Sequence, residues 1–460
     1  MATTHFPRIP VAVLTASLLT VTACSSGGQS DSSGGADAGQ FSADPSGAVT
    51  AWAFDNADDV GQARLDEAKE QLPDITVTLD ATAFDAQKFT TRLAGGTVPD
   101  VVQMDRQYVA TYAAQGLIVP LDACYSVHQV DPSQRFYPNV VEDVRFQDQI
   151  WAVPQFYQPP AILVNKRVAD AAGVGVDQFD TSAPDVLLNA IGAIYQEQGG
   201  VPTVLGFDPQ ATGQSGLWIL SQGGRLTDDG GVPALDDPAN VSALELLKSI
   251  TDAQGGWAKV KSFIDSFDTF GENNQFVADQ VGAQVNAQWY PNVLSAYADQ
   301  IDVEAVPFLD KDGNPFSVAS GTAFVIPAGA QNPDAACAWM LELTSMDAWM
   351  AAGEARAQTR EADGGINTGL FTGSPEADEA IRDKYVAPSG DEDFDQVIST
   401  YYDVVTYGQS FGASPAGQDI QNELNNAVTA TLLGDKTAEA ALKDAQEAAQ
   451  RAYDNVMAGS

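Results

Sequence analysis

The chain has 460 residues, enough for two or three domains, and its 44% hydrophobic content is normal for a protein with full cores. It has 62 acidic and 22 basic residues and a formal charge of −40, which excludes nucleic acid as a partner because phosphate binding depends on Lys and Arg. The only histidines are His5 and His128, too few for a multi-histidine zinc site. We therefore expect no metal site and no cofactor.

The first 23 residues have the pattern of an export signal. The apolar run from Val11 to Leu19 is shorter than the about 20 residues that span a bilayer, and small residues lead from it to Cys24. A cysteine at this point resembles a bacterial lipobox, which predicts cleavage before Cys24 and lipid attachment to it. An ordinary signal peptide with an incidental cysteine is the alternative. Residues 24–46 are rich in Ser, Gly and Asp and predict a flexible tether, so we expect a lipid-anchored protein on the extracellular face of the cell membrane.

Strand and helix patterns alternate after the tether. A strand is expected over 48–54, a helix over 58–72, a strand over 75–79, a helix over 84–95 and a strand over 99–105. This order predicts a parallel α/β sheet covered on both faces. Ligands bind such sheets at the carboxyl ends of the strands, which here carry Phe54, Asp55 and Asp105.

The middle of the chain contains a distinctive segment, 150–166, in which prolines flank polar and aromatic side chains. We expect it to cross beside a cleft and to offer Gln155, Tyr157 and Gln158 to a ligand. Further helices are expected over 107–115, 185–198, 215–222, 236–251, 333–344 and 418–456, the last with a break at Gly434, and strands over 203–207, 282–290, 303–308 and 323–327.

Four ordered segments carry a family resemblance. They are 95–102 with 116–122, 151–154 with 165–166, 321–327 with 332–339, and 433–446. They resemble the patterns "PD(V/I)V … G.L.PL", "YG(I/V)P … YNK", "G..(F/L).I … NP..A..F" and "G..T.EEAL..AQ" of family 1 extracellular solute-binding proteins of carbohydrate ABC importers, which are maltodextrin-binding-protein-like. Trp151 and Ala152 replace the usual Tyr-Gly of the second pattern.

The resemblance implies a two-lobed periplasmic-binding-protein-like α/β fold of type II, in which each lobe is a sheet flanked by helices and a hinge joins the lobes. By position, lobe one would hold 46–155 and 307–350, and lobe two 156–306 and 351–460. The residues themselves leave open whether Cys124 and Cys337 pair in an oxidising compartment or remain thiols. Because both would fall in lobe one, the resemblance implies a Cys124–Cys337 disulfide.

The resemblance also implies that a monomer without enzymatic activity captures a sugar or oligosaccharide by cleft closure and delivers it to the permease subunits of an ABC importer. Sugar recognition needs an aromatic ring against the apolar sugar face, and amides or carboxylates for the hydroxyls. Trp289 occupies the position of a stacking tryptophan in the family, with a core aromatic as the alternative. Asp105-Arg106 matches a strand-end pair that grips hydroxyls in relatives, and Asp105 also suits a helix N-cap. The remaining candidates are Phe54, Asp55, Gln155, Tyr157, Gln158, Gln214, Trp218, Gly321, Gln418 and Asp419, with Trp218 equally suited to the core.

Two other functions fit part of the sequence. A glycoside hydrolase needs two carboxylates about 5–10 Å apart, but the pairs Asp58-Asp59, Asp228-Asp229 and Glu392-Asp393 lie in polar, turn-like or helix-start contexts, where solvated charge is expected. Capture of peptides or polyamines would suit an acidic cleft. The run 310–314 begins like a calcium loop without the distal Glu, and predicts a hairpin turn instead.

Overall fold

A mostly parallel five-stranded sheet is built from the first part of the chain and one returning strand. The structure, a computed structural model, describes residues 41–54 and 58–459. The predicted signal, Cys24, most of the predicted tether and Asp55 therefore lie outside the described residues. The strands are β1 (Gly47–Trp52), β2 (Ile75–Asp80), β3 (Val101–Asp105), β6 (Val153–Pro154) and β14 (Thr322–Val325). Their order is β2-β1-β3-β14-β6, with β1 parallel to β2 and β3, and β14 antiparallel to β3 and β6.

Helices α1 (Asp59–Gln71) and α2 (Ala86–Ala94) connect the parallel strands, which confirms the alternation expected over 48–105. Each begins at an aspartate: Asp58 accepts a hydrogen bond from the Gly61 amide, and Asp85 from the Lys88 amide. These side chains satisfy amides that the first helical turn leaves without an intrahelical partner.

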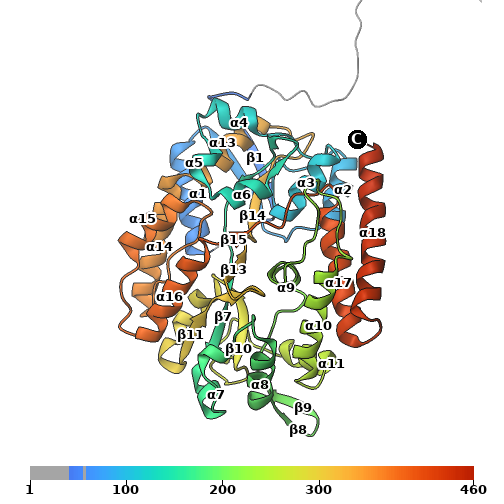
Figure 1. The fold of residues 1–460 in the computed structure, drawn as a ribbon. Coiled ribbons are helices and arrows are strands. Elements are labelled where there is room, and N and C mark those ends of the chain that lie inside the picture. The colour runs from blue at the N-terminus through green and yellow to red at the C-terminus, as the bar shows by residue number, and fades with distance from the viewer. Residues whose placement is uncertain (1–40, 55–57, 460) are drawn as a thin grey trace, which may run out of the picture. The chain divides into compact units, whose positions relative to one another are not determined.

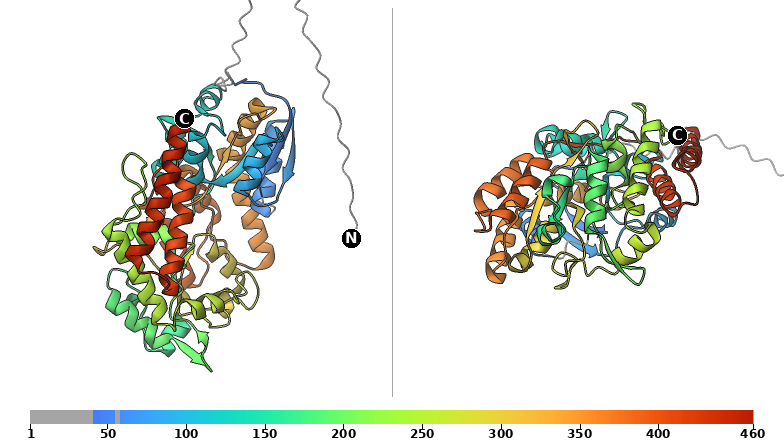
Figure 2. Two further views of the ribbon diagram at one scale, coloured as in Figure 1. Left: turned by 90° about the vertical axis from the view of Figure 1, so that its right-hand side faces the viewer. Right: turned by 60° about the horizontal axis from the view of Figure 1, so that its bottom comes forward.

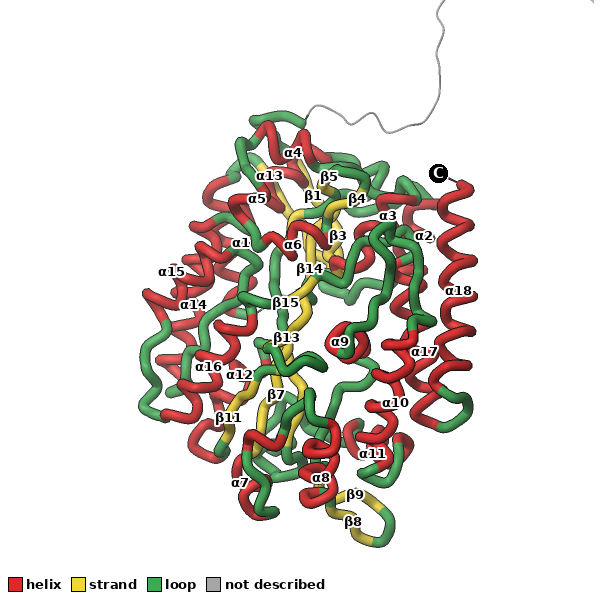
Figure 3. The backbone as a smooth tube through the Cα atoms, viewed as in Figure 1, coloured by secondary structure: helices red, strands yellow, loops and turns green. Residues whose placement is uncertain are grey.

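A second group of strands surrounds the buried strand β7. Strands β7 (Pro160–Asn165), β10 (Ala283–Ala287) and β11 (Val303–Val306) form a sheet in the order β10-β7-β11, antiparallel throughout. All six residues of β7 are buried, as expected for an apolar strand covered on both faces. Nearby, β13 (Pro315–Val318) pairs with β12 (Phe308–Leu309) and β15 (Gly408–Gln409). Figure 3 shows these strands below those of the five-stranded sheet.

Helices flank both groups of strands (Figure 1). The remaining helices are η1 (Arg106–Tyr108), α3 (Val109–Ala114), α4 (Asp122–Val127), α5 (Pro132–Arg135), α6 (Pro138–Asp143), α7 (Lys166–Ala171), η2 (Val176–Gln178), α8 (Pro184–Ile194), α9 (Ser215–Ser221), α10 (Pro238–Asp252), α11 (Trp257–Ile264), α12 (Tyr290–Leu294), η3 (Ser295–Gln300), α13 (Pro333–Leu343), α14 (Met346–Asp363), α15 (Pro375–Tyr385), α16 (Glu392–Val404), α17 (Gly417–Leu433) and α18 (Ala438–Gly459). Two short ribbons complete the fold: β4 (Arg145–Phe146) with β5 (Gln149–Ile150), and β8 (Gln196–Gln198) with β9 (Val201–Val204).

Two helix boundaries illustrate how glycine sets local structure. The break expected at Gly434 is present, because this residue has a φ of 78° and closes α17 in the left-handed conformation. The helix expected over 185–198 instead ends at Ile194, and 196–198 turn back as β8 through Gly199 and Gly200, both with positive φ.

The chain's later helices pack against its earlier elements. Helix α14 lies against α1, and α17 lies beside α18, as both views of Figure 2 show for the last pair. By the predicted boundaries β13 would belong to lobe one and β15 to lobe two, yet the two strands pair. Helix α14, which packs on α1, contains the boundary predicted at 350. The lobe boundaries remain a prediction.

A disulfide joins Cys124 of α4 to Cys337 of α13, with Cα atoms 5.9 Å apart. It is the pairing that the resemblance implied, and it links residues separated by 213 positions. Of the helices that the structure describes, none is both long and apolar enough to cross a membrane.

Candidate ligand-binding cleft

Three adjoining cavities form a cleft. The large cavity has a volume of about 550 Å³, the Arg106 cavity about 310 Å³ and the Asp85 cavity about 320 Å³. Shared lining residues show that they adjoin: Gln158 and Trp289 line the first two, Gln103 and Thr322 the large and Asp85 cavities, and Asp105 and Tyr108 the last two. Each is within or near the range of about 300–1,000 Å³ that small-molecule sites occupy.

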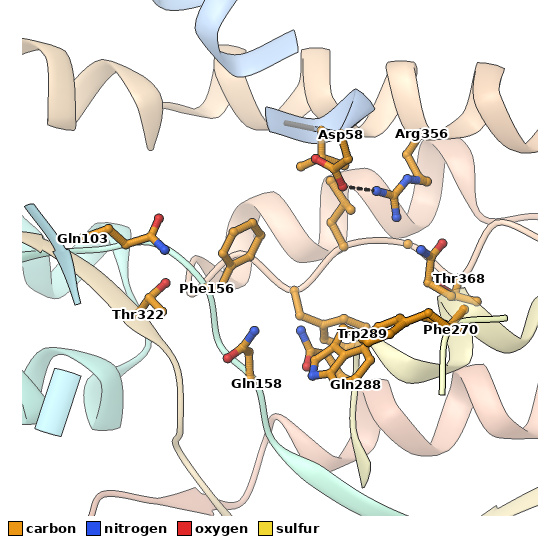
Figure 4. Close-up of a pocket in the computed structure, with 16 residues that line it drawn as sticks. Asp58, Gln103, Phe156, Gln158, Phe270, Gln288, Trp289, Thr322, Arg356 and Thr368 are labelled. Carbon is orange, nitrogen blue, oxygen red and sulfur yellow. Dashed lines mark hydrogen bonds and ion pairs between the residues drawn. The ribbon is translucent and has the colours of Figure 1, made fainter. Parts of the chain in front are cut away.

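Two aromatic rings form one wall of the large cavity (Figure 4). Trp289 directly precedes α12 and is 36% exposed, and Phe270, in the segment between α11 and β10, is 70% exposed. Their rings stack with centroids 5.7 Å apart and planes inclined by 21°. The Trp289 ring also meets the buried Tyr290 ring edge to face at 5.5 Å. One side of the Trp289 side chain therefore packs against the buried Tyr290, while part of the Trp289 surface remains exposed.

Two side-chain amides beside these rings have unused hydrogen-bonding capacity. Gln288 is only 6% exposed, and its buried Oε1 has no hydrogen-bond partner among the described residues. The buried Oδ1 of Asn292, four residues later in the chain and within α12, also has none. Both residues line the large cavity. A buried polar atom without a partner costs roughly 1–3 kcal/mol, so these positions favour a ligand that donates hydrogen bonds.

The opposite wall carries a charged cluster that the sequence did not reveal. Arg356 of α14 donates to the Asp58 carboxylate at 2.8 Å and to both Asp59 carboxylate oxygens at 2.7–3.1 Å. Burial favours the neutral form of Asp59, but the hydrogen bond and charge of Arg356 outweigh burial and lower the pKa of Asp59. This acidic pair, expected to be solvated, instead neutralises an arginine at the cavity wall.

Arg106 forms hydrogen bonds with both of the chain connections that run between the two sheets. Its guanidinium donates to the Phe156 carbonyl at 2.5 Å, in the connection from β6 to β7, and to the Ala319 carbonyl, in the connection from β13 to β14. Its Nε donates to Asp143 at 3.2 Å, and Asp143 also accepts from Ser410 at 2.5 Å. Burial raises the pKa of Asp143 to about 6, although Arg106 opposes the shift.

Gly321 makes room for this guanidinium. It has a φ of 151°, and a Cβ atom there would collide with the Phe156 carbonyl and with Arg106 Nη1. Gly321, a predicted ligand-binding residue, therefore allows the Arg106 guanidinium and the Phe156 carbonyl to approach the backbone closely.

Asp105 is the carboxylate most available to a ligand. It lines two of the three cavities, and no described side chain forms an ion pair or hydrogen bond with its carboxylate. The surrounding protein raises the pKa of Asp105 by desolvation, against the charge of Arg106, while part of the residue stays exposed. It makes no side-chain cap for η1, so the N-cap alternative is not seen.

Seven of the predicted site residues line the cleft, and the other described ones do not. Asp105, Arg106, Gln158, Gln214, Trp289 and Gly321 line the cleft. Gln418 lines the Asp85 cavity, whereas Asp419, at the first turn of α17, is half-buried and lines none of the three. Asp55 lies outside the described residues.

Four predicted residues lie in the interior rather than on the cleft surface. Phe54 packs against Phe324 and Trp339, and Trp218 against Phe207 and Phe308 while its Nε1 donates to the Pro209 carbonyl. The side chain of Gln155 donates to Gln103 and Thr322 and accepts from Arg64, and Tyr157 accepts from Asn139. Their apolar surface or hydrogen-bonding capacity is already used within the protein. These four residues were expected to contact the ligand, and the structure instead places them in the interior.

The acidic runs considered as alternatives have structural roles. Asp310 accepts from the amides of Asp312 and Asn314 in the turn between β12 and β13, which confirms the hairpin prediction. Asp228 accepts from two amides of its own loop. In the described part of the chain, no group of three or more His, Cys, Asp or Glu side chains could hold a metal ion.

Sequence reasoning missed Phe270, Gln288 and Asn292. One usable signal was present: Gln284, Asn286 and Gln288 alternate with apolar residues along β10 and its end. Polar residues at alternate positions of a buried strand share one face. Gln288, the last of the three, lines the large cavity, whereas Gln284 donates to Asp208 and Asn286 to Gln284. Phe270 is a lone aromatic in a polar loop, so its position depends on the tertiary structure.

Comparison with known proteins agrees with this geometry. Residues 63–359, more than half of the chain, match the family described as bacterial extracellular solute-binding protein. A search of curated proteins gives no match.

Similar solved structures share the fold. CpMnBP1 with mannotriose bound is 22% identical, with a TM-score of 0.69 over 87% of this chain and 99% of that one. The GacH receptor of Streptomyces glaucescens, solved unliganded and with acarbose, is 21% identical, with a TM-score of 0.65 over 89% and 99%. UgpB from Mycobacterium tuberculosis, in complex with glycerophosphocholine, is 16% identical, with a TM-score of 0.65 over 90% and 100%.

The predicted two-lobed α/β fold is thereby confirmed, and with it the resemblance stated from the four sequence segments. The family is one of binding proteins that act outside the cell. The chain belongs to the bacterial extracellular solute-binding protein family.

Proposed function

We propose that this protein captures a sugar or oligosaccharide in its cleft and delivers it to an ABC importer. The observation that carries the proposal is the pairing, on one cavity, of the partly exposed Trp289 ring with the unpartnered amide of Gln288. A sugar ring has an apolar face that suits an aromatic ring, and hydroxyls that suit free amide oxygens. Two similar structures hold mannotriose and acarbose, which supports a carbohydrate, while glycerophosphocholine in a third shows that the fold alone does not fix the solute.

Delivery follows from closure of the two lobes over the solute. Trp289 covers the apolar face of the sugar, Gln288 and Asn292 accept hydrogen bonds from its hydroxyls, and Asp105 accepts one from a hydroxyl at the other end of the cleft. A permease in the membrane then receives the solute. Lipid on Cys24 keeps this monomer at the extracellular face of the membrane, close to that permease, and the protein itself performs no chemistry on its ligand.

Isothermal titration calorimetry tests the choice of ligand. The variant Cys24→Ser, purified as a soluble protein, is titrated with mannose, mannobiose, mannotriose, glucose, maltose, maltotriose and spermidine. We expect saturable binding of at least one sugar, and no cleavage products by chromatography. Binding of spermidine alone, or hydrolysis of a sugar, would contradict the proposal.

Fractionation of cells that express the chain tests the anchor. We expect the full chain in the membrane fraction and the Cys24→Ser variant in the soluble extracellular fraction. Equal partitioning of the two proteins would show that Cys24 carries no lipid.

A further inference from the structure

Phe270 is the most exposed of the large apolar side chains that the structure describes. Single exposed apolar residues are common and need no explanation. Phe270 differs because its neighbour is a second exposed aromatic, Trp289, and both rings line the same cavity of about 550 Å³. The two rings therefore form an apolar surface on one wall of this cavity.

Hydrogen bonds hold the segment that carries Phe270. The Gly271 amide donates to the Asp268 carbonyl at 2.9 Å, and the Asn274 amide to the Gly271 carbonyl at 3.2 Å. The Asn274 side chain then accepts from the Phe276 amide at 3.1 Å, and Phe276 is buried against Tyr290. The position of Phe270 is thus fixed from both sides of its loop and through its stacking on Trp289.

The two rings present a surface for more than one sugar ring. The rings stack with planes inclined by 21° and centroids 5.7 Å apart, which is farther than the roughly 3.5–4.0 Å between carbon atoms in contact. The rings are therefore offset and cover each other only in part, and both line the cavity. Polar groups accompany both rings: Gln288 precedes Trp289 in the chain, and Thr368 lies at the Phe270 end of the cavity in Figure 4.

We propose that Phe270 is a specificity-determining residue that holds the second ring of an oligosaccharide whose first ring lies on Trp289. The ligand is then a saccharide of two or more linked rings rather than a monosaccharide. This inference rests on the proposed sugar binding, and it assigns to Phe270 a role separate from that of Trp289.

The test compares Phe270→Ala with the unsubstituted protein, both carrying Cys24→Ser, in titrations with monosaccharide and oligosaccharide of one series. For the series that binds, mannose with mannobiose and mannotriose or glucose with maltose and maltotriose, we expect Phe270→Ala to weaken oligosaccharide binding roughly 10-fold. Affinity for the monosaccharide should change less than about 2-fold. Phe270→Tyr, which keeps the ring, should restore oligosaccharide binding.

Val201→Ala is the matched control, because Val201 is also highly exposed but lies in the β8–β9 ribbon and lines none of the three cavities. It should leave all affinities unchanged, and thermal unfolding should show that both alanine variants are folded. Unchanged oligosaccharide affinity in Phe270→Ala, or an equal loss for monosaccharide and oligosaccharide, would overturn the role of Phe270. If the unsubstituted protein binds no sugar, the proposed function fails instead, and this inference with it.

Discussion

The cleft has two walls that differ in how their polar groups are used. The supporting wall consists of Gln103, Arg106 and Thr322, which line the cleft, and of the buried Gln155 directly behind them. Each of these residues is hydrogen-bonded to another part of the protein. The free wall, Phe270, Gln288, Trp289 and Asn292, has exposed rings and buried amide oxygens without partners among the described residues. Both walls contain residue types that bind sugars.

The difference shows that residue type and position near a cleft do not identify a ligand contact. A side chain has a limited number of donors and acceptors, and those already used within the protein are not available to a solute. The supporting wall should therefore contribute mainly to stability, and the free wall mainly to affinity. The four predictions below test this division.

The largest effect is expected for Arg106→Ala. Removing one partner of a buried ion pair leaves Asp143 uncompensated and costs about 3–5 kcal/mol, and two carbonyls also lose their donor. Denaturant unfolding should show this loss of stability. Arg225→Ala is the control, because the Arg225–Asp237 pair is exposed on the arginine side and should contribute less than about 1 kcal/mol. Equal effects of the two variants would show that Arg106 does not stabilise the two connections between the sheets.

Trp289→Ala should have the opposite effect: a large loss of sugar affinity with little loss of stability. Loss of a stacking aromatic at the centre of a binding site typically costs about 2–4 kcal/mol, so sugar affinity should fall on the order of 100-fold. Stability should change little, because part of the Trp289 ring is already exposed to solvent. Calorimetry gives the affinity and thermal unfolding the stability, with Trp289→Phe as the variant that retains a ring. Unchanged affinity in Trp289→Ala would refute its place in the site.

The stability of the region behind the supporting wall should also depend on pH. Asp378 is buried and accepts hydrogen bonds from the Thr372 amide at 2.7 Å and from Tyr137 at 3.1 Å, and the Tyr137 ring packs on Tyr157 of the crossover. Burial raises the pKa of Asp378 to about 7. Because the usual value is about 3.9, the folded protein binds more protons than the unfolded chain between these two values, so stability falls as pH rises through this window.

The variant Asp378→Asn imitates the neutral acid and removes this contribution. Unfolding free energies measured at pH 5 and pH 8 should fall less in Asp378→Asn than in the unsubstituted protein, by on the order of 1–3 kcal/mol. The change in unfolding free energy between pH 5 and pH 8 is compared between the two proteins, because other acidic groups with raised or lowered pKa values contribute equally to both. Identical pH slopes would show that Asp378 titrates normally.

Much of the fold could be predicted from the sequence because its signals are local. The strands and helices over 48–105 follow from periodicity and capping residues, and the order of the four family segments indicated the architecture. The helices over 346–404 were not predicted, and Arg356 in the first of them reaches back to Asp58 and Asp59. Contacts between residues so far apart in the chain have no local signature.

The site was predictable only in part, for the same reason. Trp289 and Asp105 line the cleft because each lies at the end of a strand, which is a position that the sequence reveals. Gln155 and Tyr157 lie in the predicted crossover, but the partners that occupy their polar atoms, Arg64 and Asn139, come from elsewhere in the chain. The sequence places a side chain near a cleft, whereas its availability depends on tertiary contacts.

The smallest effect, and the most direct test of the two walls, is the same substitution made on each. Gln288→Met on the free wall should weaken sugar binding about 2- to 13-fold, since one hydrogen bond contributes roughly 0.5–1.5 kcal/mol. It should leave stability unchanged or raise it, because it replaces an unpartnered buried amide with an apolar side chain of similar size.

Gln155→Met on the supporting wall should do the reverse. It removes the oxygen that accepts from Arg64 and the amide that donates to Gln103. Arg64 is a buried cation that stacks on Trp349, and burial lowers the pKa of Arg64 to about 9. Leaving such groups unpaired costs about 1–3 kcal/mol of stability, while affinity should stay within about 2-fold because Gln155 does not line the cleft. If both variants lose affinity and stability together, the two walls act as one unit, and unused hydrogen-bonding capacity does not distinguish ligand contacts from support.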